Sequence, residues 1–501
     1  MLKWILRVLA NRRRKQIQKW ANNPIVYQEK NFQYLIKNGR DTLFGKDHHF
    51  NDIKTYQDFK KYVPIRDYEG LKPYIERILY GQENVLWKGK PLYFAKTSGT
   101  TSGTKYIPIT KESMPTHIQA ARDAIFLCAY NINDVRFMLG KMMFLSGSPE
   151  FDEVKHGIPV GRLSGIVQHH VPKIFLRNRV PSWDTNIIPD WETKVKKIAQ
   201  ETISQDLRLI SGIPPWVQMY CEEVYKLTGK KLAEVFPNLS VFVQGGVDYR
   251  PYEKVLNEAI GKKLQMIEVY PASEGFIAYQ DTMDKEGLLL ILDNYIFYEF
   301  IPADEVFKEN PTRLSLKEVE TGVNYAIILN TNAGLWGYNI GDTVRFVSKN
   351  PYRIVVTGRI KHFISAFGEH VISEEVNKAM LETAQIFNAE ITEFTVAPYL
   401  GDRHKELPYH EWFIEFATLP QSLDKFATYL DQKMQNLNSY YKDLRQGNVL
   451  QELKIRIVPK DGFIEYMKSI GKLGGQNKLP RLSNDRKIAD ALMNMFFINA
   501  S

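Results

Sequence analysis

The spacing of apolar residues predicts that the first 90 residues are mostly helical. Within residues 19–39 and 55–63, apolar side chains recur every three or four positions, which is the period of a helix with one buried face. Pro64 and Pro73 are expected to divide this region into separate helices, because proline disrupts a helix interior. The same period over residues 111–130 predicts one further long helix.

Farther along, short β-type runs alternate with helical stretches. Residues 239–246 and 263–275 are apolar strands that end in glycines or a polar turn. Helices are predicted over residues 194–212, 214–229 and 252–261. Strand, turn and helix in alternation favour an α/β architecture with a partly parallel sheet.

The pattern changes in the second half of the chain. Short β segments follow at 287–302, 323–331 and 342–348, and the last part runs helix, two strands, helix, strand. That order is typical of a compact α+β domain. We therefore predict a fold class of α/β and α+β. A large N-terminal domain with mixed sheets and helices would cover residues 1–357, and a small, mobile C-terminal α+β domain would cover residues 358–501.

Length and composition agree with this plan. A chain of 501 residues exceeds the usual size of one hydrophobic core, and 44% hydrophobic residues suit a globular protein. The sequence has no apolar stretch long enough to span a bilayer, and its start lacks the arrangement of a secretory signal. Two cysteines, Cys128 and Cys221, are too few for a disulfide framework. We expect a cytoplasmic protein.

Positive charge is concentrated at the beginning of the chain. The net charge is +9, from 66 basic and 57 acidic residues, and residues 1–20 hold seven Lys and Arg and no acid. The rest carries 59 basic against 57 acidic residues, or +2, which argues against a nucleic-acid partner. Four apolar residues can share one helix face there: Leu2, Ile5, Leu6 and Leu9. One hypothesis is a weak contact with an anionic membrane or an acidic partner. The other is a solvated helix end, dispensable for catalysis.

A run of small residues at 97–105, TSGTTSGTK, lies between two apolar strand-like stretches. Glycine, serine and threonine are common in turns and linkers, so composition alone favours a hairpin turn. The alternative is a phosphate cradle, in which glycines let backbone N–H groups approach an anion and Lys105 adds charge. The standard Walker A spacing is absent, because only three residues separate Gly99 from Gly103.

Three later stretches would complete a nucleotide site with that loop. Residues 269–275, VYPASEG, offer an aromatic ring and a carboxylate, and residues 337–346, GYNIGDTVRF, offer Asp342. Residues 474–481, GGQNKLPR, offer Lys478. Each alone is weak evidence, since a loop lysine or an acid after a strand is usually a solvated turn residue. Together they supply a phosphate loop, a ring for a base, acids for Mg²⁺ and a ribose diol, and a late lysine.

In order and spacing, these stretches resemble the adenylate-forming superfamily of acyl-CoA synthetases, firefly luciferases and peptide-synthetase adenylation domains. Within it, the chain is most similar to the Gretchen Hagen family of plant auxin-responsive acyl acid–amido synthetases and their bacterial relatives, over nearly its whole length. Residues 62–87 also match the region before their loop. The resemblance implies a ligase that uses ATP and Mg²⁺, converts a carboxylic acid into an acyl-AMP, and forms an amide bond with an amine, in particular an amino acid.

The resemblance also implies roles for single residues around the nucleotide. The loop would order the ATP β- and γ-phosphates through Ser98, Gly99, Thr100, Thr101, Gly103 and Lys105. The adenine and the α-phosphate would be contacted by Gly245, Gly246, Tyr270, Ala272 and Ser273.

The remaining implied roles concern charge and movement. Glu274 would coordinate Mg²⁺, and Asp342 would accept both ribose hydroxyls. Arg359 would lie at the hinge into the small domain, and Lys478 would be the lysine that this domain brings to the α-phosphate.

One departure from the plant pattern stands beside Asp342. The plant sequences commonly have Tyr-Arg where this chain has Tyr338-Asn339, so a contact on the ribose or phosphate side is expected to differ. The residues that form the acyl pocket of the plant proteins have no clear counterparts in this chain. The sequence therefore does not identify the carboxylic acid substrate. Two alternatives also stay open: an acid–CoA ligase with the same domain plan, and a nucleotide-binding homologue without catalysis.

Overall fold

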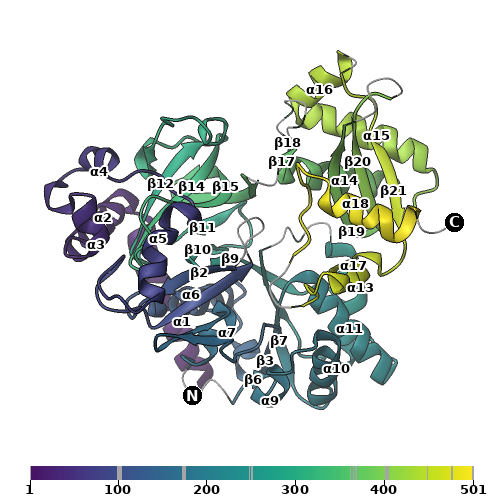
Figure 1. The fold of residues 1–501 in the computed structure, drawn as a ribbon. Coiled ribbons are helices and arrows are strands. Elements are labelled where there is room, and N and C mark those ends of the chain that lie inside the picture. Colours follow the sequence, from purple (N-terminus) through teal and green to yellow (C-terminus); the bar gives the residue numbers. More distant parts are fainter. Residues whose placement is uncertain are drawn as a thin grey trace. The chain divides into compact units, whose positions relative to one another are not determined.

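The computed structural model describes residues 2–98, 104–171, 177–246, 249, 252–360, 363–364, 366, 369, 371–400, 406–447, 449–474 and 478–498. Its contacts divide the chain into two units, which are described separately (Figure 1). Unit 1 comprises Met1–Gly246 and Leu264–Val355, and unit 2 comprises Val247–Lys263 and Val356–Ser501. The assignment of residues 247–263 to unit 2 had no signal in the sequence. The boundary at residue 358 stays a prediction about which part moves.

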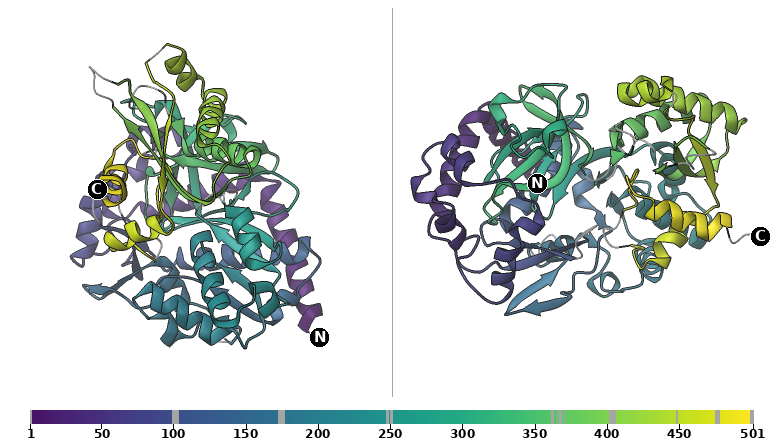
Figure 2. Two further views of the ribbon diagram at one scale, coloured as in Figure 1. Left: turned by 90° about the vertical axis from the view of Figure 1, so that its right-hand side faces the viewer. Right: turned by 45° about the horizontal axis from the view of Figure 1, so that its top comes forward.

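Unit 1 begins with the helices that the apolar spacing predicts. They are α1 (Leu2–Ala21), α2 (Pro24–Gly39), α3 (Leu43–Asp47), α4 (Tyr56–Tyr62) and α5 (Tyr68–Leu79). Helices α2 to α5 lie together at one edge of unit 1 (Figures 1 and 2). Local chemistry sets their starts. Pro24 occupies the first turn of α2, Thr55 and Asp58 form a capping box on α4, and the Asp67 side chain caps α5.

The second half of α1 belongs to the core of unit 1. Ile17 and Trp20 are buried, and α1 packs against α6 (Met114–Asn131). The Arg13 guanidinium donates two hydrogen bonds of 2.7 Å to the buried carboxylate of Asp123 on α6. The hypothesis that residues 1–20 form only a solvated helix end is therefore wrong for Arg13 onward, because apolar and charged contacts fix that part.

A small sheet carries the hairpin that the sequence places around residue 100. Its strands are β1 (Tyr93–Ser98), β2 (Thr104–Ile109), β4 (Glu153–Lys155) and β5 (Ile158–Gly161), in the order β2-β1-β5-β4. Strands β1 and β2 are antiparallel, and Thr97 lies opposite Lys105. Lys105 is therefore one residue pair away from the segment that connects the two strands.

The large sheet has twelve strands among the described residues. Its order is β13-β12-β14-β15-β16-β11-β10-β9-β8-β7-β3-β6. The pairs from β6 through β3, β7 and β8 to β9 are parallel. The pairs β9–β10, β10–β11, β11–β16, β15–β14, β14–β12 and β12–β13 are antiparallel. The bounds are β3 (Lys141–Phe144), β6 (Arg179–Val180), β7 (Leu207–Ser211), β8 (Val241–Gly245), β9 (Gln265–Ala272), β10 (Gly275–Tyr279), β11 (Leu288–Leu290), β12 (Ile296–Pro302), β13 (Leu314–Ser315), β14 (Asn324–Thr331), β15 (Tyr338–Lys349) and β16 (Tyr352–Arg359).

One strand of this sheet contradicts the sequence-based helix over residues 194–212. Helix α10 covers only Trp191–Thr202, and Leu207–Ser211 form β7. The apolar positions of β7 continue the three- and four-residue spacing of α10, so the period alone could not separate them. Pairing with β3 and β8 on both sides decides the strand. The other helices of unit 1 are α7 (Leu163–Gln168), α9 (Trp183–Asn186), α11 (Pro214–Thr228) and α12 (Leu232–Val235).

Helix α6 packs against β9 and β10 and buries a histidine. Burial lowers the pKa of His117 from its usual 6.5 to about 4. The unfolded chain therefore binds a proton between pH 6.5 and 4 that the folded chain refuses, so His117 costs stability as the pH falls through this window.

We expect His117→Leu to lose less folding stability than the wild type on acidification, by up to about 3 kcal/mol at pH 4. Near pH 7.5 His117 is neutral in both the folded and the unfolded chain, so no such difference arises there. Urea unfolding of both proteins at pH 7.5 and pH 4.5 measures the difference. Equal losses on acidification in the two proteins would contradict the effect.

Unit 2 confirms the predicted α+β order. Its sheet runs β19-β20-β21, with β19 (Glu390–Tyr399) antiparallel and β21 (Lys454–Val458) parallel to β20 (Tyr409–Thr418). A two-stranded ladder joins β17 (Phe363–Ile364) and β18 (Val371–Ile372). Its helices are α13 (Glu253–Ile260), α14 (Ser373–Ile386), α15 (Leu423–Leu437), α16 (Ser439–Gln446), α17 (Gly462–Ser469) and α18 (Lys487–Met493).

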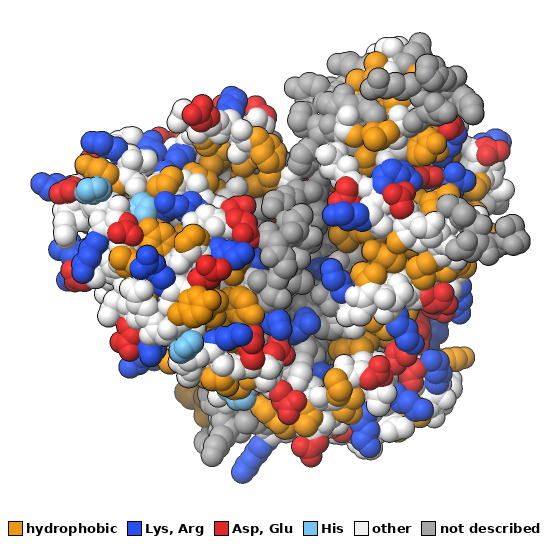
Figure 3. Space-filling model, in the orientation of Figure 1, with side chains coloured by type: hydrophobic (Ala, Val, Ile, Leu, Met, Phe, Trp, Pro, Cys, Tyr) orange, Lys and Arg blue, Asp and Glu red, His pale blue; other side chains and the backbone are white. Residues whose placement is uncertain are grey.

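Surface charge follows the count made from the sequence. On the face in Figure 3, acidic and basic side chains are interspersed over the described surface, and no broad field of one sign covers it. Among the described residues, no helix combines the length and apolar character needed to cross a membrane.

Candidate functional site

The candidate site lies where parallel strands of unit 1 end. Strand β8 finishes at Gly245, and its neighbour β9 finishes at Ala272, so both sets of predicted residues share one edge of the sheet. Ligands of open α/β sheets bind at this carboxyl edge. Gly245 also has a structural reason to be glycine, because a Cβ there would lie 2.2 Å from the Val269 carbonyl oxygen.

A tight turn presents Ser273 and Glu274 at this edge. Ala272 at the end of β9 pairs with Gly275 at the start of β10, which leaves two residues to reverse the chain. Ser273 is buried and the Glu274 side chain is half-buried. The turn therefore holds the predicted metal-binding carboxylate directly beside the predicted α-phosphate contacts.

The structure brings Tyr270 and Asp342 together. The Tyr270 hydroxyl donates a hydrogen bond of 2.6 Å to Asp342 Oδ2, and both side chains are buried. Their strands β9 and β15 are separated in the sheet order by β10, β11 and β16. The sheet must curve to allow this contact. Curvature thus unites two motifs that lie 72 residues apart in the chain.

A bulge in β15 sets the position of Asp342. Ala326 of β14 pairs with Thr343 and Ile328 pairs with Asn339, so three residues of β15 face a single residue of β14. The Asn339 side chain accepts a 2.9 Å hydrogen bond from the Gly341 backbone N–H and closes the turn. This is the role of the asparagine that departs from the plant pattern. Bulges redirect side chains at functional sites in this way.

Gly341 is the residue that the bulge requires. Its φ is +87°, a conformation that a side chain with Cβ adopts only at a cost. We expect Gly341→Ala to destabilise unit 1 by about 1–2 kcal/mol, because no heavy atom lies within 4 Å of the added Cβ and only the backbone resists.

The matched control is Gly341→Asn, since asparagine tolerates positive φ better than alanine. Denaturant midpoints of the two variants measure the difference. An alanine variant as stable as the wild type, or less perturbed than the asparagine variant, would contradict the strain at this bulge.

Two tyrosines that sequence reasoning missed connect Glu274 to Lys105. The Tyr338 hydroxyl lies 3.5 Å from Glu274 Oε1, and Tyr338 is fully buried. Burial, followed by the Glu274 charge, raises the pKa of Tyr338 well above its usual value, and nearby Tyr68 adds to this. The Lys105 ammonium lies 5.7 Å from the centre of the Tyr68 ring. Tyr338 lies in the stretch 337–346 and Tyr68 in the stretch 62–87, and both stretches were recognised from the sequence.

Several predicted site residues cannot be placed in this arrangement. Gly99, Thr100, Thr101 and Gly103 lie outside the described residues, and Ser98 is described only as the last backbone position of β1. Gly246 follows β8 with a φ of +86°. The contacts with ATP proposed for these positions stay predictions.

Arg359 and Lys478 belong to unit 2, which is described by itself. Arg359 is exposed at the end of β16, and Lys478 is exposed in a segment without helix or strand. Gly358, next to Arg359, has a φ of +153°, and a Cβ there would lie 3.3 Å from the Ser373 side chain.

The carboxylate chemistry of the site fits magnesium better than a transition metal. No group of three or more His, Cys, Asp or Glu that could hold a metal occurs in the part of the chain that is described. Mg²⁺ is commonly bound through one or two carboxylates together with substrate phosphates, and Glu274 offers one carboxylate at the edge of the sheet.

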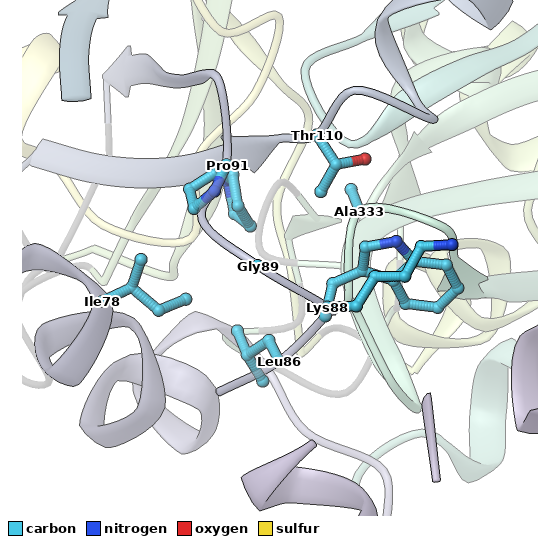
Figure 4. Close-up of a pocket in the computed structure, with 9 residues that line it drawn as sticks. Ile78, Leu86, Lys88, Gly89, Pro91, Thr110 and Ala333 are labelled. Carbon is cyan, nitrogen blue, oxygen red and sulfur yellow. The ribbon is translucent and has the colours of Figure 1, made fainter. Parts of the chain in front are cut away.

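A separate small cavity in unit 1 does not belong to the site. It lies beside the segment after α5 and is lined by residues that include Ile78, Leu86, Pro91, Thr110 and Ala333 (Figure 4). Its volume is about 10 Å³, which is space for about one water molecule. None of the predicted site residues lines it.

Comparison with known proteins gives a consistent result along the chain. Three family models match: the GH3 family N-terminal domain over residues 13–190, the central domain over 289–359 and the C-terminal domain over 374–487. The jasmonoyl–L-amino acid synthetase JAR4 of Nicotiana attenuata is 22% identical, over 91% of this chain and 90% of that protein.

Two further similarities point the same way. The indole-3-acetic acid-amido synthetase GH3.3 of Arabidopsis thaliana is 21% identical, over 95% of this chain and 92% of its own. The solved structure of the AtGH3.15 acyl acid amido synthetase with 2,4-DB has the same fold, with a TM-score of 0.80, 15% identity and coverage of 97% of this chain and 96% of that one.

Proposed function

We propose that this chain, which belongs to the GH3 family, is an ATP-dependent ligase that activates a carboxylic acid as an acyl-adenylate and transfers the acyl group to an amino acid. The supporting observation is the pairing of Tyr270 with Asp342 beside Glu274, because it assembles the predicted base, ribose and metal contacts at one edge of the sheet. The amido synthetase names of the relatives support the amide product.

The first half-reaction joins two anions. An oxygen of the acid carboxylate attacks the α-phosphorus of ATP, the bond to the bridging oxygen breaks, and pyrophosphate leaves. Lys105, near the connection between β1 and β2, offsets the repulsion between the two anions. Asp342, oriented by the Tyr270 hydroxyl, would accept hydrogen bonds from the ribose hydroxyls. When Mg²⁺ is bound, Glu274 would hold it, and the ion would neutralise charge on the phosphate oxygens.

The second half-reaction needs no covalent enzyme intermediate. The neutral amine attacks the acyl carbon, the bond to the AMP oxygen breaks, and the amine gives up one proton as the amide forms. Burial raises the pKa of both thiols, Cys128 and Cys221, to about 12, so neither is a thiolate near neutral pH. This chemistry agrees with direct transfer to a free acceptor.

ATP–pyrophosphate exchange over a panel of carboxylic acids tests the first half. The panel should include the acids in the relatives' names, jasmonic acid and indole-3-acetic acid, and simple aryl and alkyl acids. AMP release with amino acids or with CoA then decides the acceptor. Release with CoA alone would make the protein an acid–CoA ligase. No exchange with any acid, despite ATP binding, would favour a homologue without catalysis.

We further propose that residues 358–501 move relative to residues 1–357 and carry Lys478 to the α-phosphate during adenylation. A glycine with φ of +153° at position 358 and the neighbouring Arg359 support a hinge there. Lys478→Ala is then expected to lower acyl-adenylate formation by about 100-fold or more, and to spare amide formation from a supplied acyl-AMP.

Lys472→Ala is the matched control, because Lys472 is an exposed lysine of the same unit outside the QNKLPR motif. Pyrophosphate exchange and amide formation from synthetic acyl-AMP are measured separately. Equal loss in both assays would assign Lys478 a structural role, and no loss in either would leave it a solvated loop residue.

We propose small molecules as the partners of the reaction: a carboxylic acid, an amino acid and ATP. The ATP requirement and the two free, buried cysteines support a cytoplasmic location. The membrane contact predicted for residues 1–20 is independent of this reaction and is a separate proposal.

A further inference from the structure

The first two turns of α1 present apolar side chains to solvent. The exposed fractions are 58% for Leu2, 68% for Trp4, 38% for Ile5, 45% for Val8 and 42% for Leu9. Leu6 differs, because it is only partly exposed and packs against the core of unit 1. The exposed apolar set therefore includes Trp4 and Val8. It excludes Leu6, which the sequence pattern had placed on the same face as three other apolar residues.

Basic residues lie among these apolar residues and beyond them on the same helix. Lys3, Arg7, Arg12, Lys15 and Lys19 are exposed. Residues 1–20 contain no acid, whereas the rest of the chain is close to neutral. Arg13 is engaged with Asp123 and does not belong to the exposed set. These exposed apolar and basic side chains form one continuous surface, which we call the α1 tip (residues 2–12).

The fold fixes the direction in which the α1 tip points. Ile17 and Trp20 are buried, and the bonds from Arg13 to Asp123 attach the helix to α6. Residues 2–9 extend beyond that attachment, and the N-terminal end of α1 lies at the edge of unit 1 (Figure 1 and Figure 2, left). The tip is thus a fixed projection from the folded unit.

We propose that the α1 tip docks reversibly on an anionic lipid surface. Leu2, Trp4 and Val8 would enter the boundary between headgroups and acyl chains, where tryptophan is well accommodated. Arg7 and Arg12 would meet the anionic headgroups. This combination of a short apolar insertion and several basic residues is the two-part signal that peripheral membrane attachment requires.

A second copy of the chain is a poorer occupant. Pairing two α1 tips would bring together two segments that each carry three basic residues and no acid. An anionic bilayer complements both the charge and the apolar end. The proposal is independent of the ligase reaction, because none of the residues in the tip lies in the candidate site.

Flotation of the full-length protein with vesicles tests the proposal. Vesicles of phosphatidylcholine alone are compared with vesicles that also contain phosphatidylserine. Two double variants test the apolar and the charged contributions to vesicle binding separately. Trp4→Ser with Val8→Ser removes apolar contacts, and Arg7→Gln with Arg12→Gln removes charge. The matched controls lie elsewhere on the surface: Tyr80→Ser, which replaces a side chain that is 78% exposed, and Lys230→Gln with Lys231→Gln.

We expect the wild type to bind the anionic vesicles and each tip variant to lose about tenfold or more of that binding. The charge variant alone should also lose most of the salt dependence. The controls should bind as the wild type does, and unchanged melting temperatures should show that all variants fold. Absence of wild-type binding, or equal binding by tip variants and controls, would overturn the proposal. So would concentration-dependent dimerisation that the tip variants abolish without any vesicle binding.

Discussion

Arg13→Ala is expected to cost about 3–5 kcal/mol of folding stability, because it leaves the buried carboxylate of Asp123 without its cation. Asp123 is 2% exposed, and burial already raises its pKa against the opposing influence of Arg13. Asp293, which accepts a 3.3 Å hydrogen bond from the same guanidinium, would lose a partner as well. Chemical unfolding of unit 1 measures the loss.

The loss should depend on pH in a defined direction. Without Arg13, the folded-state pKa of Asp123 rises further, and the cost of the buried charge appears as the pH rises above the unfolded value. Arg13→Ala should therefore be more destabilising at pH 8 than at pH 5. Protonation of the carboxyl at the lower pH relieves the buried charge.

Two companion variants separate the ion pair from other effects. Arg12→Ala makes the same change one position away on the exposed side of α1, and should cost less than about 0.5 kcal/mol. Arg13→Met combined with Asp123→Leu should recover most of the loss, because two apolar side chains replace a complete pair. If Arg13→Ala were no worse than Arg12→Ala, the pair would have no structural role.

The contrast between Arg12 and Arg13 shows what the sequence could not supply. Charge counts and apolar spacing predicted a basic amphipathic helix at the start of the chain, and that helix is α1. Both arginines look alike in a count of charges. Their difference arises from Asp123 on α6, 110 residues away, which the local pattern does not reveal.

The same limit applies to the candidate site. The motifs that contain Tyr270, Glu274 and Asp342 were recognisable from residue types and spacing, because each follows a strand with a turn signal. The link through Tyr338 and Tyr68 was not, since it depends on the curvature of the sheet. Strand β7 was missed for a related reason, because its apolar spacing continues that of α10. Local period predicts elements, whereas pairing and curvature decide between alternatives.

Lys105→Ala is expected to slow acyl-adenylate formation by about 100- to 1,000-fold, the usual cost of removing one electrostatic donor from developing charge. Lys105 lies opposite Thr97, near the connection between β1 and β2, and its ammonium lies over the Tyr68 ring. Losing that ring contact should cost at most about 1 kcal/mol of stability. Catalysis should therefore fall far more than folding, as pyrophosphate exchange and thermal unfolding together can measure.

Lys96→Ala gives the matched comparison on the neighbouring strand. Lys96 lies opposite Tyr106 in the same hairpin, and its ammonium is 3.4 Å from the partly exposed Asp152 carboxylate. An ion pair of this kind contributes little, so exchange should stay within about twofold of the wild type. Because the two variants remove the same side chain from adjacent strands, general weakening of the hairpin would affect them alike. Equal exchange rates in the two variants would return the 97–105 segment to the simpler interpretation of a hairpin turn.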